Sequence, residues 1–296
     1  MAPLIKRTQT AIARHQNVSG PGRTIIVGDV HGCSAELETL LDRVAFTSGD
    51  RLVFVGDVLA RGPDSLGVLD IIRQTGAILV RGNHEQKVLD ARAPDRRTFA
   101  GAPSDLHRAI ARTLRPVDWS LLESSPVHVA FNEHELVVVH AGVVPGTALE
   151  HQDFETMMRI RTIALNRFQV DARSRRGRGA DRNSLSMALR TAPQAPTMRS
   201  RQIESGNVLW GTRWVGPPHI VFGHNAAPGL QLHPWATGLD TGCVYGGRLT
   251  ALVLGAGRKV PRDLAARRAL LVSVPARRVW HVPDKSRSAV TQGDRA

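Results

Sequence analysis

Cysteine is nearly absent from this chain of 296 residues, which contains only Cys33 and Cys243. Two cysteines cannot form a disulfide framework, so the disulfide-rich secreted class is excluded and a reducing cytoplasm is expected. Aromatic residues make up 4% of the chain, which leaves few side chains that can stack on a nucleobase. No apolar run approaches the roughly 20 residues of a membrane-spanning helix. We therefore expect a soluble protein without membrane contact.

The two ends of the chain contain few patterns that predict a helix or a strand. Residues 1–23 contain only short apolar stretches and no small-residue cleavage site, so we expect an N-terminal lead-in rather than a signal peptide. Residues 284–296 are polar, and we expect a disordered tail there. The remaining residues, 24–283, are enough to bury a large core, which predicts one elaborated domain.

Acidic residues are outnumbered by basic ones, 26 to 39, and the net charge is +13. Between Arg159 and Glu204 the chain has eleven arginines and three acidic residues, so most of the excess lies in one segment. Residues 171–206 within it show no hydrophobic periodicity. Two interpretations remain: a solvated, disordered insertion, or an arginine-rich lip that attracts phosphates of a phosphoprotein or an RNA.

One pattern occurs three times in the first third of the chain. Residues 24–32 read TIIVGDVHG, 51–57 read RLVFVGD, and 77–85 read AILVRGNHE. Each apolar run predicts a strand and precedes a helical pattern, which together indicate parallel βαβ units. Asp29 and His31 stand two positions apart and can reach the same ion. Because open α/β sheets place their sites at the carboxyl ends of strands, we expect one shared site.

The rest of the chain alternates between helical and strand patterns. Helical patterns within residues 86–126 predict a small helical cap over the site. Residues 127–140 predict a hairpin that ends in His140, and residues 219–224 predict a strand that ends in His224. Further strands are expected at 236–240, 247–254 and 269–274.

Five of these motifs resemble, in order, those of the calcineurin-like metallophosphoesterases, in the phosphoprotein phosphatase branch. They are Gly28-Asp29-Val30-His31-Gly32, Gly56-Asp57 with Arg61-Gly62, Gly82-Asn83-His84-Glu85, His140-Ala141-Gly142 and Gly223-His224. The resemblance implies an α/β (α+β) fold, a β-sandwich of two mixed sheets flanked by helices, to which the helical cap would be added.

The resemblance also implies a centre of two divalent metal ions. The six expected ligands are Asp29, His31, Asp57, Asn83, His140 and His224. The first two would hold one ion, Asp57 would bridge both ions, and the last three would hold the other. Carboxylate, amide and imidazole ligands without cysteine favour manganese, with cobalt, iron or zinc as alternatives. Such a pair of ions would activate a water and neutralise phosphate oxygens.

Residues beside the ligands are given roles in catalysis and phosphate binding. His84 would be the general acid that protonates the leaving oxygen, next to the catalytic Asp57. Arg61 would bind a phosphate through its planar guanidinium, together with Asn83. A structural histidine at a helix start and a surface ion pair are the alternative interpretations of His84 and Arg61.

Position 60 departs from the protein-phosphatase pattern, in which an aspartate supports the catalytic histidine. With Ala60, either another carboxylate supports His84 or its basicity is set differently. The run Ala60-Arg61-Gly62-Pro63 and residues 240–252 resemble instead the symmetrical diadenosine tetraphosphatases, which cleave diadenosine tetraphosphate into two ADP. Asp240 would either orient a metal-bound histidine or belong to a simple turn.

We therefore predict a dinuclear-metal phosphohydrolase that acts on dinucleoside polyphosphates. Two alternatives are a serine/threonine phosphoprotein phosphatase and an RNA-binding or RNA cap-hydrolysing protein that uses residues 171–206. The oligomeric state is left open. Three histidines are interpreted as structural or surface residues: His107, His128 and His219. The aromatic candidates for stacking on a base are Trp210, Trp214, Trp235 and Tyr245.

Overall fold

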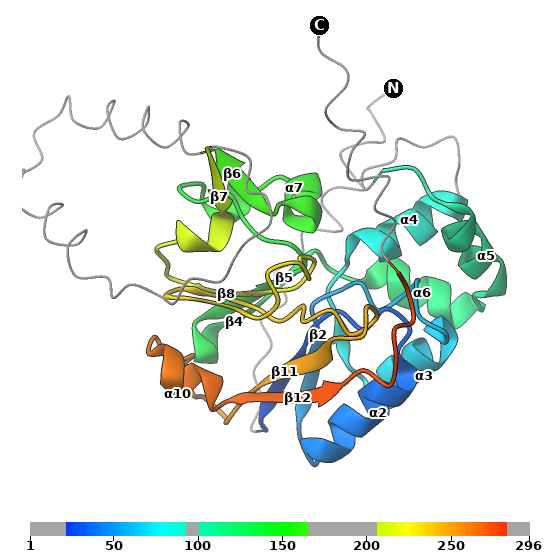
Figure 1. The fold of residues 1–296 in the computed structure, drawn as a ribbon, viewed down its shortest axis with the longest axis horizontal. Helices are drawn as coiled ribbons and strands as arrows, with labels where there is room; N and C mark the ends of the chain where they lie inside the picture. The colour runs from blue at the N-terminus through cyan, green and yellow to red at the C-terminus, as the bar shows by residue number, and fades with distance from the viewer. Residues whose placement is uncertain (1–21, 93–100, 165–205, 283–296) are drawn as a thin grey trace, which may run out of the picture.

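The computed structural model describes residues 22–92, 101–164 and 206–282, which form two facing five-stranded sheets with helices outside them (Figure 1). The first sheet has the order β12-β11-β1-β2-β3 and the second has the order β4-β5-β8-β10-β9. Both sheets are mixed, because β1, β2 and β3 are parallel, as are β5, β8 and β10, while the outer neighbours run antiparallel. The sandwich implied by the family resemblance is confirmed.

The strands of the first sheet are β1 (Thr24–Val27), β2 (Arg51–Phe54), β3 (Ile78–Leu79), β11 (Arg248–Leu254) and β12 (Leu271–Pro275). Those of the second are β4 (His128–Phe131), β5 (Leu136–Val139), β8 (His219–Phe222), β9 (Gln231–His233) and β10 (Ala236–Gly238). A separate pair is formed by β6 (Thr162–Ala164) and β7 (Asn207–Leu209). The helices are α2 (Ser34–Arg43), α3 (Ser65–Thr75), α4 (Asn83–Arg92), α5 (Asp105–Thr113), α6 (Pro116–Ser124), α7 (Phe154–Arg159) and α10 (Leu264–Arg268).

The central strands are apolar after their first residue because both of their faces are buried. On β1, Ile25 packs with the helices outside the first sheet, whereas its neighbour Ile26 packs between the two sheets. Successive side chains of a strand point to opposite faces, so an alternating polar pattern would leave one of these layers without apolar contacts. The uninterrupted β-branched runs in the sequence therefore correspond to strands covered on both sides.

Helices cover the outer face of each sheet. Residues of α2 and α3 form one apolar cluster with the outward side chains of β1 and β2. The helix α3 is capped at its N-terminus by Asp64, whose carboxylate accepts the Gly67 N–H, and at its C-terminus by Gly76 in the left-handed conformation. On the other side, Met157 and Met158 of α7 pack with Trp210 against the second sheet. These helices therefore cover the sheets on the faces that point away from the partner sheet.

The region in which the sequence predicts a helical cap contains the helices α4, α5 and α6, and α5 packs closely on α4. The hairpin of β4 and β5 and the strands β8, β10, β11 and β12 also occur where the sequence predicts them. The sequence interpretation missed β6, β7, β9, α7 and α10, which are short. The arginine-rich stretch at 171–205, residues 1–21 of the lead-in and the predicted tail lie outside the described residues. Within the described part, none of the helices has the length and apolarity needed to span a bilayer.

A fully buried arginine ties α10 to the second sheet. The guanidinium of Arg267 donates to the carbonyl oxygens of Pro261 at 2.8 Å and His233 at 2.6 Å, and further carbonyls surround it. Burial lowers its pKa to about 10, so it still carries its charge at neutral pH. The side chain satisfies backbone oxygens that would otherwise be buried without partners.

We expect Arg267→Ala to lower the free energy of unfolding by about 2–4 kcal/mol, because several buried carbonyls lose their donor. Urea denaturation followed by circular dichroism measures the change. The matched control is Arg268→Ala, since Arg268 is the exposed neighbour on the same helix and should change stability by less than about 0.5 kcal/mol. Equal losses for the two variants would contradict this role of Arg267.

Candidate metal centre

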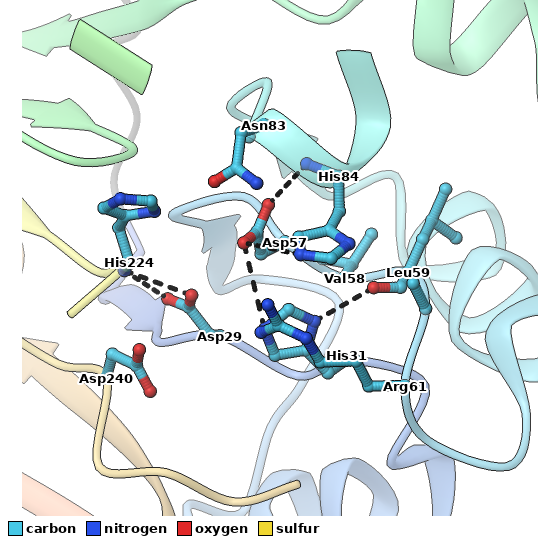
Figure 2. Close-up of polar contacts among 12 residues, drawn as sticks. Asp29, His31, Asp57, Val58, Leu59, Arg61, Asn83, His84, His224 and Asp240 are labelled. Carbon is cyan, nitrogen blue, oxygen red and sulfur yellow. Dashed lines mark hydrogen bonds and ion pairs between the residues drawn. The ribbon is translucent and has the colours of Figure 1, made fainter. Parts of the chain in front are cut away.

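The expected ligands follow strands, at points where the backbone turns sharply. His31, Asp57 and His224 come after β1, β2 and β8 and have φ angles of 50°, 50° and 69°. Non-glycine residues rarely occupy this left-handed region, which costs on the order of 1 kcal/mol or more at each position. Figure 2 shows the resulting arrangement, in which these side chains and those of Asp29 and Asn83 surround one space.

Asp57 lies at the middle of this group. Its Oδ2 atom is 3.8 Å from His31 Nε2, 4.0 Å from His84 Nε2 and 3.4 Å from His140 Nε2. Its other oxygen accepts the backbone N–H of His84 at 2.8 Å. Burial opposes ionisation of Asp57, but the surrounding histidines hold its pKa well below the usual value. This is the position that a ligand shared by two cations requires.

On one side of Asp57, three further ligand atoms converge. The ring of His140 bonds the Val55 carbonyl through Nδ1, and its Nε2 lies 3.1 Å from Asn83 Oδ1. Burial lowers the pKa of His140, yet Asp57 raises it above the ordinary value, so positive charge is stabilised between these groups. A divalent cation can replace that proton. The buried Nε2 of His224 has no hydrogen-bond partner among the described residues, which fits a nitrogen that binds a metal.

On the other side, Asp29 and His31 are held with their ligand atoms accessible to the centre. Both oxygens of Asp29 accept the backbone N–H of His224, at 3.0 and 3.1 Å. The His31 ring contacts the Leu59 carbonyl through Nδ1, at 3.0 Å, so Nε2 is the nitrogen that could bind a metal, and the Arg61 guanidinium contacts it in this structure. Burial lowers the pKa of His31 to about 4, so the ring is neutral at physiological pH.

Several buried carboxylates face one another in this centre. Burial and the charges of Asp240 and Asp57 raise the pKa of Asp29 well above its usual value. Burial likewise raises the pKa of Asp240 to about 6 and that of Glu85 to about 7, with a further contribution from Asp57 in both cases. Among the described residues, none of these four acids forms a direct ion pair with an arginine or lysine, and such a concentration of acids is typical of sites that bind divalent cations. The residues present therefore fit a metal centre.

Asp240 lies beside Asp29 in Figure 2, and its Oδ1 accepts the Gly242 N–H at 3.1 Å. This bond lies within a turn, which agrees with the second of the two interpretations of Asp240 drawn from the sequence. A role in orienting a metal-bound histidine stays a prediction.

Glu85 organises the loops that carry the ligands, a role that was not assigned from the sequence. Its two oxygens accept the backbone N–H groups of Asp57, Val58, Leu59 and Gly82, at 2.8 to 3.2 Å. The side chain is fully buried. One carboxylate thus links the ends of β2 and β3. The sequence feature that could have indicated this role is the position of Glu85 at the end of the Asn-His-Glu motif.

His107 was interpreted as a structural or surface histidine, but it lies inside the centre. It is 4% exposed, and its Nε2 is 2.9 Å from Nδ1 of His84. The partner of His84 at this nitrogen is therefore another imidazole, not the carboxylate considered as one way to replace an aspartate at Ala60. Because His107 comes from α5, 23 residues away, no local pattern could have connected the two.

The aromatic candidates separate into core and site residues. Trp210 is 1% exposed, and its indole N–H donates to the Ala141 carbonyl, so it cannot stack on a base. Trp214 is half-buried and donates to the Pro218 carbonyl. Tyr245 lies near the centre, with the Arg61 guanidinium 5.6 Å from its ring centroid. Arg61 also places one guanidinium nitrogen 2.8 Å from His31 Nε2.

Comparison with known proteins gives a consistent result. Residues 22–255 match the family model described as calcineurin-like phosphoesterase. A curated protein of Nitrosomonas europaea is 33% identical, covering 78% of this chain and 94% of that protein, and one of Chromohalobacter salexigens is 34% identical, covering 79% and 95%. Both are named symmetrical bis(5'-nucleosyl)-tetraphosphatase. A crystal structure assigned provisionally to a diadenosine tetraphosphatase superposes with a TM-score of 0.63 and 30% identity, covering 88% of this chain and 96% of that one.

We expect Gly223→Ala to weaken divalent metal binding by about 10- to 100-fold, the range seen when groups that orient ligands are lost. An added Cβ would stand 1.9 Å from Asp29 Oδ1 and displace that carboxylate. Isothermal titration calorimetry of the demetallated protein with Mn²⁺ measures the effect.

The matched control is Gly49→Ala, where the nearest atom to the added Cβ is 3.7 Å away. It should bind Mn²⁺ as the unmodified protein does. Unchanged binding by Gly223→Ala would show that Asp29 does not take part in the centre.

Proposed function

Because this chain belongs to the calcineurin-like phosphoesterase family, we propose that it is a metal-dependent hydrolase that cleaves dinucleoside polyphosphates symmetrically, diadenosine tetraphosphate to two ADP. The relatives from Nitrosomonas europaea and Chromohalobacter salexigens carry the name of that activity, and the match extends over 94% and 95% of their lengths. The reaction breaks the phosphoanhydride bond in the middle of the tetraphosphate.

The residues of the centre would hold two divalent cations. Asp29 and His31 would bind one ion, and Asn83 with the histidines at 140 and 224 would bind the other, while Asp57 would contact both. Manganese suits this mixture of oxygen and imidazole ligands, with cobalt, iron or zinc as alternatives. Cations in this position would lower the pKa of a water and neutralise phosphate oxygens.

The observation that carries the choice of substrate is a group of cationic side chains around the centre. Burial lowers the pKa of Lys87, and the positive charges of Arg61, Arg159 and Arg161 lower it further, whereas Asp57 raises it. These side chains are therefore close enough to repel one another. A tetraphosphate chain brings enough negative charge to relieve that repulsion, whereas the single phosphate of a phosphoserine brings much less.

Arg61 and His84 are placed to act on the phosphates directly. The Arg61 guanidinium contacts His31 and stacks near Tyr245, so it is fixed beside the first metal position and can bind a phosphate with two parallel hydrogen bonds. His84 directs Nε2 toward Asp57 at 4.0 Å. From there it can reach an oxygen of a phosphate bound at the centre.

The test is to identify the products of diadenosine tetraphosphate with the Mn²⁺-loaded protein, using anion-exchange chromatography. We expect ADP alone, and Asp57→Asn should reduce turnover by about 100-fold or more because the shared ligand is lost. A mixture of AMP and ATP would contradict a central cut. Faster turnover of a phosphoserine peptide in the same assay would favour a protein phosphatase instead.

We also expect Arg61→Lys to lower kcat/KM for diadenosine tetraphosphate by about 10- to 100-fold, since a lysine cannot form the bidentate contact. Steady-state kinetics under identical metal loading measures this value. Arg213→Lys is the matched control, because Arg213 is exposed and the substitution should leave the kinetics unchanged. If Arg61→Lys retained full kcat/KM, Arg61 would not be a phosphate ligand.

A further inference from the structure

Two histidines of the cap form a buried hydrogen bond at the centre. His84 lies in the first turn of α4 and His107 lies in the first turn of α5, and each residue is 4% exposed. His107 Nε2 and His84 Nδ1 are 2.9 Å apart, and the ring planes are inclined by 30°. One of these nitrogens must donate and the other must accept, so the direction of the bond fixes where both protons lie.

The backbone before α5 determines that direction. The N–H of Ser104 donates to His107 Nδ1 at 3.1 Å, and the Ser104 hydroxyl lies 2.7 Å from the same nitrogen. A backbone N–H can only donate, so Nδ1 of His107 carries no proton. The proton of His107 is therefore on Nε2 and is donated to Nδ1 of His84. As a result, His84 carries its own proton on Nε2, the nitrogen that faces Asp57.

We propose that His107 is the positioning residue that holds His84 as a neutral hydrogen-bond donor, with its Nε2–H directed at the substrate phosphates. This inference deepens the proposed function and rests on it for the identity of the substrate. His84 lies close enough to His31 and Asp57 to be considered a metal ligand. A protonated Nε2 cannot bind a metal, so His84 acts on the substrate and not on the cations.

The arrangement favours one class of leaving group. When the central anhydride bond breaks, its electron pair stays on an oxygen of the departing ADP. That oxygen belongs to a phosphate, which is stable as an anion, so a hydrogen bond from His84 is sufficient and the proton need not be transferred. An alkoxide leaving from a serine ester would need a complete proton, which a neutral imidazole gives up poorly. His107 therefore contributes to specificity for anhydrides over alkyl phosphate esters.

Two substitutions of His107 separate its two hydrogen bonds. In His107→Asn, the amide oxygen can replace Nδ1 and accept the Ser104 N–H, but nothing reaches His84. In His107→Gln, the amide nitrogen can replace Nε2 and donate to His84, while the contact with Ser104 is lost. Ile110→Ala is the control for a loosened α5, because Ile110 packs against the apolar cluster under the cap and its aliphatic side chain cannot form a hydrogen bond with His84.

We expect His107→Asn to lower kcat for diadenosine tetraphosphate by about 10- to 100-fold, with KM changed by less than about twofold. His107→Gln should retain at least a third of the original kcat, and Ile110→Ala should lose stability in urea without losing activity. A role limited to capping α5 predicts the reverse order, in which the Asn variant is active and the Gln variant is impaired. That result would overturn the proposal.

NMR can locate the protons on the His84 ring without any measurement of activity. In Zn²⁺-loaded protein with ¹⁵N-labelled histidine, NMR should show His84 with a bare Nδ1 and a protonated Nε2, and this state should be lost in His107→Asn. A protonated Nδ1 in the unmodified protein would overturn the assignment even if every activity were as expected. If diadenosine tetraphosphate is not hydrolysed at all, the proposed function fails, while the NMR result still decides the role of His107.

Discussion

The repulsion among buried carboxylates is the interaction on which the rest of the structure depends. Asp29, Asp57, Asp240 and Glu85 are all buried in one region, and burial, together with the charge of Asp57, raises the pKa values of the other three. A folded protein tolerates such a group when cations or hydrogen bonds compensate for the lost hydration. Glu85 is compensated by four backbone N–H groups, whereas Asp29 and Asp57 each receive the N–H of a single residue, which is consistent with a need for cations beside them.

The fold brings these carboxylates together at strand ends whose backbone conformations are unfavourable by themselves. His31, Asp57 and His224 keep left-handed backbone conformations, and Gly223 leaves no room for a Cβ beside Asp29. Each of these features opposes folding by itself. They persist because the strands behind them are fully buried between two apolar layers, which supply stabilisation that the centre does not.

The cap contributes chemistry as well as cover. Its helix α4 begins with Asn83, which is proposed as a metal ligand, and with His84, and α5 supplies the imidazole that contacts His84. A group at position 60 would approach from the loop after β2, whereas His107 approaches from a helix packed on α4. Replacing a carboxylate by an imidazole changes the bond from one that would accept the His84 proton to one that donates to its ring. Phosphatases with similar metal centres can therefore differ in how they treat the leaving group.

The sequence by itself determined the repeated strand-turn-helix units and the residues that end them, because hydrophobic runs and the glycine-flanked polar tips are local features. Asp29, His31, Asp57, Asn83, His140 and His224 were all identified in this way, together with a family resemblance, and the structure brings them into one centre. Only the tertiary structure decided the contact between His107 and His84 and the four backbone bonds of Glu85. These depend on how α5 packs on α4 and how neighbouring strand ends approach each other, and such distances between remote segments leave no periodic signal in the chain.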